Sequence, residues 1–244
     1  MNKLKLFIDN FIVYGIGGVI GKVIPLIMLP IITRIMPDST YYGLSDMSNT
    51  VVQFGSAIAL LWMYDAMYRL FFEKDDIEYK KDICSTTFVF TMGSSLAVFL
   101  LMIFFKDTFL RFVFKNKDYS YLVYISAVTT LTSATNGIVS APTRMQNKRK
   151  VFLVVNAIIP ILSYSIAISL LLNEFYVLAL PLAAAISGIV SEVIFWVLNK
   201  NWFSIRRFRN ELLRPLLIIA IPLVPNFLIY WVFNSCDRIM IANL

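Results

Sequence analysis

The sequence predicts an all-α, polytopic membrane protein with about seven transmembrane helices. The first reason is composition, because 59% of the residues are hydrophobic, 15% are charged and the mean hydropathy is +0.74. A soluble domain is nearer 45–50% apolar and about 25% charged. The second reason is that the apolar residues fall into long runs. A helix of about 20 such residues matches the ~30 Å hydrocarbon thickness of a bilayer, where the backbone must satisfy its own hydrogen bonds.

Seven runs are long enough to be considered as spans. They are residues 11–32, 44–72, 84–105, 121–142, 151–172, 177–198 and a last run that begins at Pro215. We expect residues 1–213 to form an N-terminal six-helix bundle. Residues 214–244 would be the first helix of a second bundle that is truncated. Proline and glycine residues in several runs, such as Pro25 and Pro222, predict kinked helices.

The segments between the runs are short and polar, and they predict the orientation. If the N-terminus lies in the cytoplasm, 15 of the 22 Lys and Arg residues fall in inner segments, six in outer segments and Lys22 within a span. This bias predicts a cytoplasmic N-terminus. The charged residues 73–82 are expected to form a loop in water. Residues 106–120 and 199–214 mix basic and apolar residues, and we expect both to lie at the membrane surface.

Some polar residues lie inside the predicted spans and indicate a wet interior. Lys22 interrupts the first run, where a lysine costs about 3 kcal/mol on insertion scales. It either binds an anion, or snorkels, or pairs with an acid such as Asp46 or Glu192. Asp65 and Arg69 are four residues apart on one helix face and can neutralise each other.

The fourth run is unusually rich in hydroxyl groups. It contains Ser126, Thr129, Thr130, Thr132, Ser133 and Thr135, followed by Asn136. Hydroxyl groups can bond to carbonyls of their own helix, and we expect this of about half of them. We expect the remainder to face a polar cavity.

Several kinds of chemistry are disfavoured by what the sequence contains. There is no histidine, which removes histidine-based acid–base catalysis and histidine metal ligands. Cys84 and Cys236 lie at opposite ends of their predicted spans, too far apart for a disulfide. We therefore expect no catalytic residue, no metal and no cofactor. The net charge of +7 follows from the topology-setting loops and does not predict nucleic-acid binding.

Four segments together resemble a known family. They are residues 21–47 (GKVIPLIMLPIITRIMPDSTYYGLSDM), 64–72 (YDAMYRLFF), 142–148 (PTRMQNK) and 222–241, which include PLVPNFL and SCDRIMI. The chain is similar over its whole length to the N-terminal half of polysaccharide flippases, which handle O-antigen or capsule repeat units. These belong to the multidrug/oligosaccharidyl-lipid/polysaccharide exporter superfamily. Its members have 12 to 14 spans in two halves, which is why we expect this chain to be truncated.

The resemblance implies a function and a set of partners. It implies that a polyprenyl-pyrophosphate-linked oligosaccharide is moved from the inner to the outer leaflet by alternating access. The implied location is the bacterial cytoplasmic membrane, with membrane lipids and the polysaccharide polymerase machinery as partners. We assign substrate binding to a first set of residues and gating or charge pairing to a second. The first set is Lys22, Arg69, Arg144, Asn136 and Thr132, and the second is Asp65, Glu192, Asp237 and Arg238.

Other functions compete with this interpretation. A cation-coupled multidrug exporter of the same superfamily would share the fold but have an acidic cavity. A membrane-embedded glycosyl- or acyltransferase would need catalytic acids or a histidine on a large aqueous loop. A seven-span receptor would have its N-terminus outside the cell. A non-functional fragment is a further alternative.

Overall fold

The computed structural model describes residues 19, 21–114, 117–225 and 229. A helix over residues 21–35 comes first. It is followed by α2 (Ser39–Leu60), α3 (Met63–Phe71), α4 (Ile77–Phe104), α5 (Lys106–Phe109), η1 (Leu110–Phe114), η2 (Lys117–Tyr119), α6 (Ser120–Val139), α7 (Ala141–Met145), α8 (Arg149–Leu172), α9 (Ala179–Asn199), η3 (Lys200–Trp202), η4 (Ile205–Arg207), α10 (Asn210–Ala220) and η5 (Ile221–Leu223). The part of the chain that the structure describes contains no strand.

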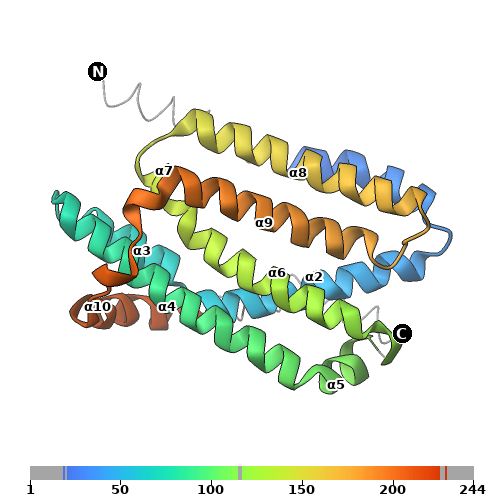
Figure 1. Ribbon diagram of the computed structural model, residues 1–244, viewed down its shortest axis with the longest axis horizontal. Helices are drawn as coiled ribbons and strands as arrows, with labels where there is room; N and C mark the ends of the chain where they lie inside the picture. Colours follow the sequence, from blue (N-terminus) through green and yellow to red (C-terminus); the bar gives the residue numbers. More distant parts are fainter. Residues whose placement is uncertain (1–18, 20, 115–116, 226–228, 230–244) are drawn as a thin grey trace.

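The long helices form an elongated bundle in which α6 is central. It packs against α2, α4 and α9, and α8 packs on the far side of α9. Figure 1 shows α3, α7 and α10 at one end of the bundle and α5 at the other. Four helical segments are long and apolar enough to cross a membrane: Ile77–Phe104, Ser120–Met145, Arg149–Leu172 and Ala179–Trp202. The predicted class of all-α polytopic membrane protein is therefore confirmed.

Close packing between α2 and α6 depends on a small residue. A Cβ atom added at Gly55 would lie 2.8 Å from Cγ2 of Thr130. Thr130 is fully buried, and Ser48 on α2 shares a 2.6 Å hydrogen bond with Ser126 on α6. Small residues and hydroxyl pairs of this kind are how membrane helices approach each other closely.

The second predicted run does not form one continuous helix. It breaks at Leu61 and Trp62, whose φ angles are 46° and 59°. Positive φ is uncommon for residues other than glycine, and the local sequence has no glycine or proline that would predict the break. The hydroxyl of Ser94 on α4 donates to the carbonyl of Ala59 just before the break. Beyond it, α3 buries Met63, Ala66 and Met67 in the main hydrophobic core against α4 and α10.

Two further boundaries differ from the sequence prediction. Residues 77–82 were expected in a loop, but α4 begins at Ile77 because the Asp76 carboxylate caps it, accepting from the Glu78 N–H at 3.1 Å. The charged residues that follow therefore occupy the first turns of a helix. The last helix begins at Asn210 and not at Pro215, which is the sixth residue of α10 and cannot donate a backbone hydrogen bond there.

Candidate functional site

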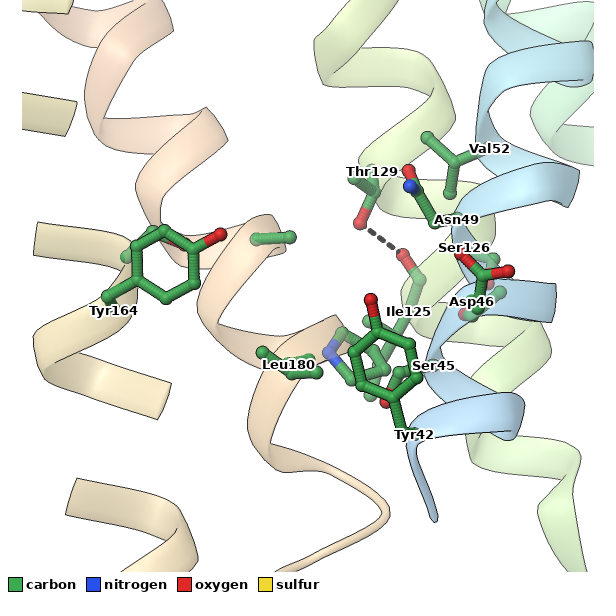
Figure 2. A pocket seen from close by; sticks show the side chains of 14 residues that line it. Tyr42, Ser45, Asp46, Asn49, Val52, Ile125, Ser126, Thr129, Tyr164 and Leu180 are labelled. Atoms are coloured by element: carbon green, nitrogen blue, oxygen red, sulfur yellow. Dashed lines mark hydrogen bonds between the residues drawn. The ribbon is translucent and has the colours of Figure 1, made fainter. Parts of the chain in front are cut away.

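A polar face on α2 lines a cavity between α2, α6, α8 and α9. Tyr42, Ser45, Asp46 and Asn49 follow one another at helical spacing, which places them on the same side of α2. The cavity has a volume of about 240 Å³, and half of its 14 lining residues carry a hydroxyl group. Figure 2 shows Tyr164 on one side of it and Tyr42, Asp46 and Asn49 on the other.

Some of the lining hydroxyl groups are already engaged in hydrogen bonds. Ser126 pairs with Ser48, Thr129 donates to the carbonyl of Ile125 at 2.7 Å, and Ser45 donates to that of Tyr41 at 3.2 Å. Hydroxyl and amide groups can both donate and accept, and the Asp46 carboxylate accepts, so the cavity can bind a hydroxylated group. Its volume is below the 300–1,000 Å³ typical of sites for drug-sized ligands. In this conformation it admits only part of an oligosaccharide.

A second cavity of about 590 Å³ lies toward the other end of α6. It is lined by α3, the α3–α4 turn, α7 and the start of α8, through Tyr64, Asp65, Tyr68, Phe72, Arg144, Met145, Asn147 and Phe152. The Arg144 guanidinium lies 5.9 Å from the ring centroid of Tyr64 and 4.9 Å from that of Phe152. These are cation–π distances. Arg144 is exposed and forms no ion pair within the described ranges, so its N–H groups are available to an anion.

A buried asparagine sets the position of Arg144. The amide nitrogen of Asn199, at the end of α9, donates to the carbonyl of Val139 at 2.9 Å and to the hydroxyl of Thr143 at 2.8 Å. These contacts hold the junction between α6 and the short helix α7, from which Arg144 projects. Asn199 is fully buried, and it was not among the residues that sequence reasoning selected.

Three of the predicted site residues meet at the interface of α6 and α9. The side-chain amide of Asn136 donates to the Ser191 hydroxyl at 3.2 Å, and Glu192 follows Ser191 in α9. Thr132 faces Gly188, but its hydroxyl donates a hydrogen bond to the carbonyl of Val128 or Thr129 in its own helix. Thr132, Asn136 and Glu192 are therefore brought together between two helices, outside the linings of both cavities.

The remaining predicted residues are more dispersed. Lys22 is exposed on the first helix, lines neither cavity, and has no ion pair to Asp46 or Glu192 in the described structure. Asp65 lines the Arg144 cavity, whereas Arg69 does not, and no ion pair joins Asp65 to Arg69 among the described side chains.

Asp237 and Arg238 lie outside the described residues. The polar face of α2 is not among the predicted site residues, although its helical spacing is visible in the sequence, and Asp46 is predicted only as a partner for Lys22.

The predicted surface segment after α9 is fixed to α4 by charges and hydroxyl groups. Asp82 accepts from Nε of Arg209 at 2.6 Å and from Arg207 at 3.3 Å, and Arg207 also donates to Glu78 at 2.6 Å. The hydrogen bond from Arg207 to Glu78 raises the pKa of Arg207. Three more hydrogen bonds complete this contact. They join Ser85 to the carbonyl of Trp202 and to the N–H of Ser204, and Thr86 to the N–H of Arg209.

Within the residues that the structure describes, no cluster of three acidic or cysteine side chains is placed to hold a metal ion. A search of curated proteins finds no match to the chain, and neither does a search of solved structures. A family model described as polysaccharide biosynthesis protein matches residues 7–244. Because this match covers nearly the whole chain, the protein belongs to the polysaccharide biosynthesis protein family of membrane proteins.

Proposed function

We propose that the chain serves the translocation of a polyprenyl-pyrophosphate-linked oligosaccharide from the inner to the outer leaflet of a bacterial cytoplasmic membrane. The observation that carries this proposal is the pair of cavities toward opposite ends of α6. One presents the unpaired Arg144 guanidinium, and the other is rich in hydroxyl groups. Family membership and the membrane-spanning helices support a role in polysaccharide-related transport.

The chemistry of each cavity corresponds to one part of the substrate. A pyrophosphate is bound best by charge-assisted hydrogen bonds, which Arg144 can donate. The sugar units offer many hydroxyl groups, which Ser, Thr, Tyr and Asn side chains can pair with. Asp65 lines the same cavity as Arg144, so a carboxylate is close to the guanidinium once the anion has left.

The proposed direction of transport rests on the predicted orientation. With a cytoplasmic N-terminus, the Arg144 cavity opens toward the cytoplasm and the hydroxyl-lined cavity lies toward the outer leaflet. The lipid-linked unit would enter head first at Arg144, and the polysaccharide polymerase machinery would receive it on the outer side. We include the remaining predicted site residues, Lys22 and Arg69 among them, as hypotheses for later steps along this path.

One observation favours a second candidate, a cation-coupled multidrug exporter. Asp46 places a carboxylate in the hydroxyl-lined cavity, and an acidic cavity is what such an exporter would need. The two functions differ in the sign of the charge that is moved. The flippase must accept an anionic head group, whereas the exporter must accept an organic cation.

Reconstitution of the chain into vesicles tests the proposal. A labelled polyprenyl-pyrophosphate oligosaccharide is placed in one leaflet, and its appearance in the other is measured by binding of a membrane-impermeant lectin. We expect appearance above that in protein-free vesicles, and no uptake of a cationic dye. Dye transport without movement of the oligosaccharide would favour the exporter, and movement of neither would favour a non-functional fragment.

A further inference from the structure

An apolar groove on the outer surface of α4 and α9 is separate from both cavities described above. It has a volume of about 520 Å³ and is lined by Phe88 and Met92 of α4, Trp196 of α9, and Phe203, Ile205 and Arg206 of the segment that follows. This volume lies within the 300–1,000 Å³ range of small-molecule sites. Ser204 completes the lining, and apart from Ser204 and Arg206 the side chains that line the groove are apolar, so the groove is unsuited to sugars.

Three aromatic rings give the groove a fixed floor. The ring centroids of Phe88 and Trp196 are 5.1 Å apart, those of Phe88 and Phe203 are 5.3 Å apart, and Trp196 stacks on Phe203 at 5.8 Å. Phe88 and Phe203 are each only 7% exposed, whereas Met92 and Trp196 remain 49% and 40% exposed. The buried rings are held by the core, and the exposed side chains offer an apolar surface to a ligand.

One unpaired cation stands at the mouth of this groove. Arg207 and Arg209 are neutralised by Glu78 and Asp82. Arg206 lies in the same connection between α9 and α10. It is exposed and forms no ion pair with any described residue. Its guanidinium therefore faces outward, beside apolar side chains, with its full charge available to an external anion.

The charge and the apolar surface lie at different depths along α4. Asp82, which holds the Arg207 and Arg209 side chains, marks the charged level. At 1.5 Å per residue, Phe88 and Met92 lie roughly 9 and 15 Å further along the helix axis. The groove thus runs from a cationic mouth into the apolar part of the span, which is the arrangement of head group and chain in a phospholipid.

We propose that this groove binds one anionic phospholipid, with its phosphate on Arg206 and an acyl chain along Phe88, Met92 and Trp196. The proposal does not depend on the transported substrate. It uses the predicted orientation, in which this end of the bundle faces the cytoplasmic leaflet, where anionic lipids attract basic groups and pockets between spans bind their head groups.

Lipid retention by the purified chain tests the proposal. The protein in detergent is incubated with equal amounts of phosphatidylglycerol and phosphatidylcholine, and the lipid that remains bound is measured by native mass spectrometry. The wild type should retain phosphatidylglycerol preferentially, and Arg206→Gln should lower this preference about tenfold, as expected for one lost charge-assisted hydrogen bond. Lys150→Gln, an exposed cation away from the groove, should leave the preference unchanged.

A second measurement locates the acyl chain. Phosphatidylglycerol with brominated chains should quench the tryptophan emission, and the quenched part should shrink in Trp196→Phe, because that ring lines the groove. Equal retention of the two lipids by the wild type would overturn the proposal. Equal losses in Arg206→Gln and Lys150→Gln would also overturn it, since they would show attraction to charge in general. Unchanged quenching in Trp196→Phe would place the lipid elsewhere.

Discussion

The carboxylate of Asp82 accepts a 2.6 Å hydrogen bond from Nε of Arg209, a residue 127 positions further along the chain. With the second contact to Arg207, this pair attaches the connection between α9 and α10 to the first turns of α4. Because α10 itself packs against α3 and α4, these elements form one unit at the Arg144 end of the bundle. Any movement of α10 in a transport cycle must therefore carry α4 with it or break this contact.

Substitution of Asp82 should destabilise that unit. Its side chain is only 10% exposed, so Asp82→Asn leaves Arg209 without a carboxylate partner and Arg207 with Glu78 alone. We expect a loss of about 1–3 kcal/mol in the free energy of unfolding. This is below the 3–5 kcal/mol of a fully buried pair, because Arg209 is 60% exposed and screened by water. Thermal unfolding in detergent measures it.

Asp75→Asn is the matched control for this prediction. Asp75 also forms an ion pair, with Lys80 at 2.6 Å, but its side chain is fully exposed. We expect no measurable change in the midpoint of unfolding. If both variants lost the same stability, the Asp82 contact would have no special structural role.

The close approach of α2 and α6 predicts opposite outcomes for two glycines. A methyl group at Gly55 would be 2.8 Å from Cγ2 of Thr130, so Gly55→Ala must push the helices apart, at a cost of about 1–3 kcal/mol. At Gly93 nothing lies within 4 Å of an added Cβ, and Gly93→Ala should be neutral or slightly stabilising. The thermal unfolding midpoints of the two variants, compared with that of the wild type, test this prediction. An unchanged midpoint for Gly55→Ala would contradict the observed packing.

Removal of the buried asparagine should disturb the support of Arg144. Asn199→Ala deletes two hydrogen bonds and leaves the carbonyl of Val139 without this donor in a buried place. A cost of about 1–3 kcal/mol in unfolding free energy follows. Asn201→Ala, at an exposed position two residues later, should have little effect. Equal midpoints for the two variants would show that the junction of α6 and α7 does not need Asn199.

The start of α2, which carries the polar face, should respond to acid. The N–H and hydroxyl of Thr40 donate to the Asp38 carboxylate and lower its pKa below the ordinary value of 3.8. A lowered folded-state pKa means that the contribution of Asp38 to stability is present above about pH 4 and is lost as the pH falls below 3.8. The difference in unfolding midpoint between wild type and Asp38→Ala should therefore shrink between pH 5 and pH 3. A difference that stays constant over this range would mean that the ionised carboxylate is not the stabilising form.

The sequence predicted those features that depend on hydrocarbon length and composition. The run 151–172 became α8 (Arg149–Leu172), and the run 177–198 became α9 (Ala179–Asn199), because a span must match the bilayer whatever its neighbours are. The hydroxyl groups of α6 followed the prediction only in part, because Thr130 is buried against Gly55 and lines neither cavity. Thr129, Thr132 and Thr135 bond to carbonyls of their own helix, and Ser126 reaches another helix and lines a cavity.

The features that were missed depend on contacts between distant segments. The break at Leu61 and Trp62 has no proline or glycine to signal it, and Ser94, which bonds just before it, is remote in sequence. Asn199 likewise acts on residues some 60 positions away. Lys22 was expected to bind an anion, to snorkel or to pair with an acid, and the structure exposes it on the first helix without an ion pair to Asp46 or Glu192 among the described residues. A sequence pattern indicates that a charge within a span is costly, but it does not indicate which way the charged side chain points.

Translocation by an Arg144 variant tests the central claim most directly. The lectin-detected appearance of lipid-linked oligosaccharide is compared for wild type, Arg144→Gln and Lys150→Gln, each first shown to fold by its unfolding midpoint. Loss of a charge-assisted hydrogen bond worth about 1.5–3 kcal/mol predicts a rate lower by roughly ten- to a hundredfold for Arg144→Gln. The Lys150→Gln rate should equal that of the wild type. A folded Arg144→Gln protein that moves the substrate at the wild-type rate would contradict the proposal that this cavity receives the pyrophosphate.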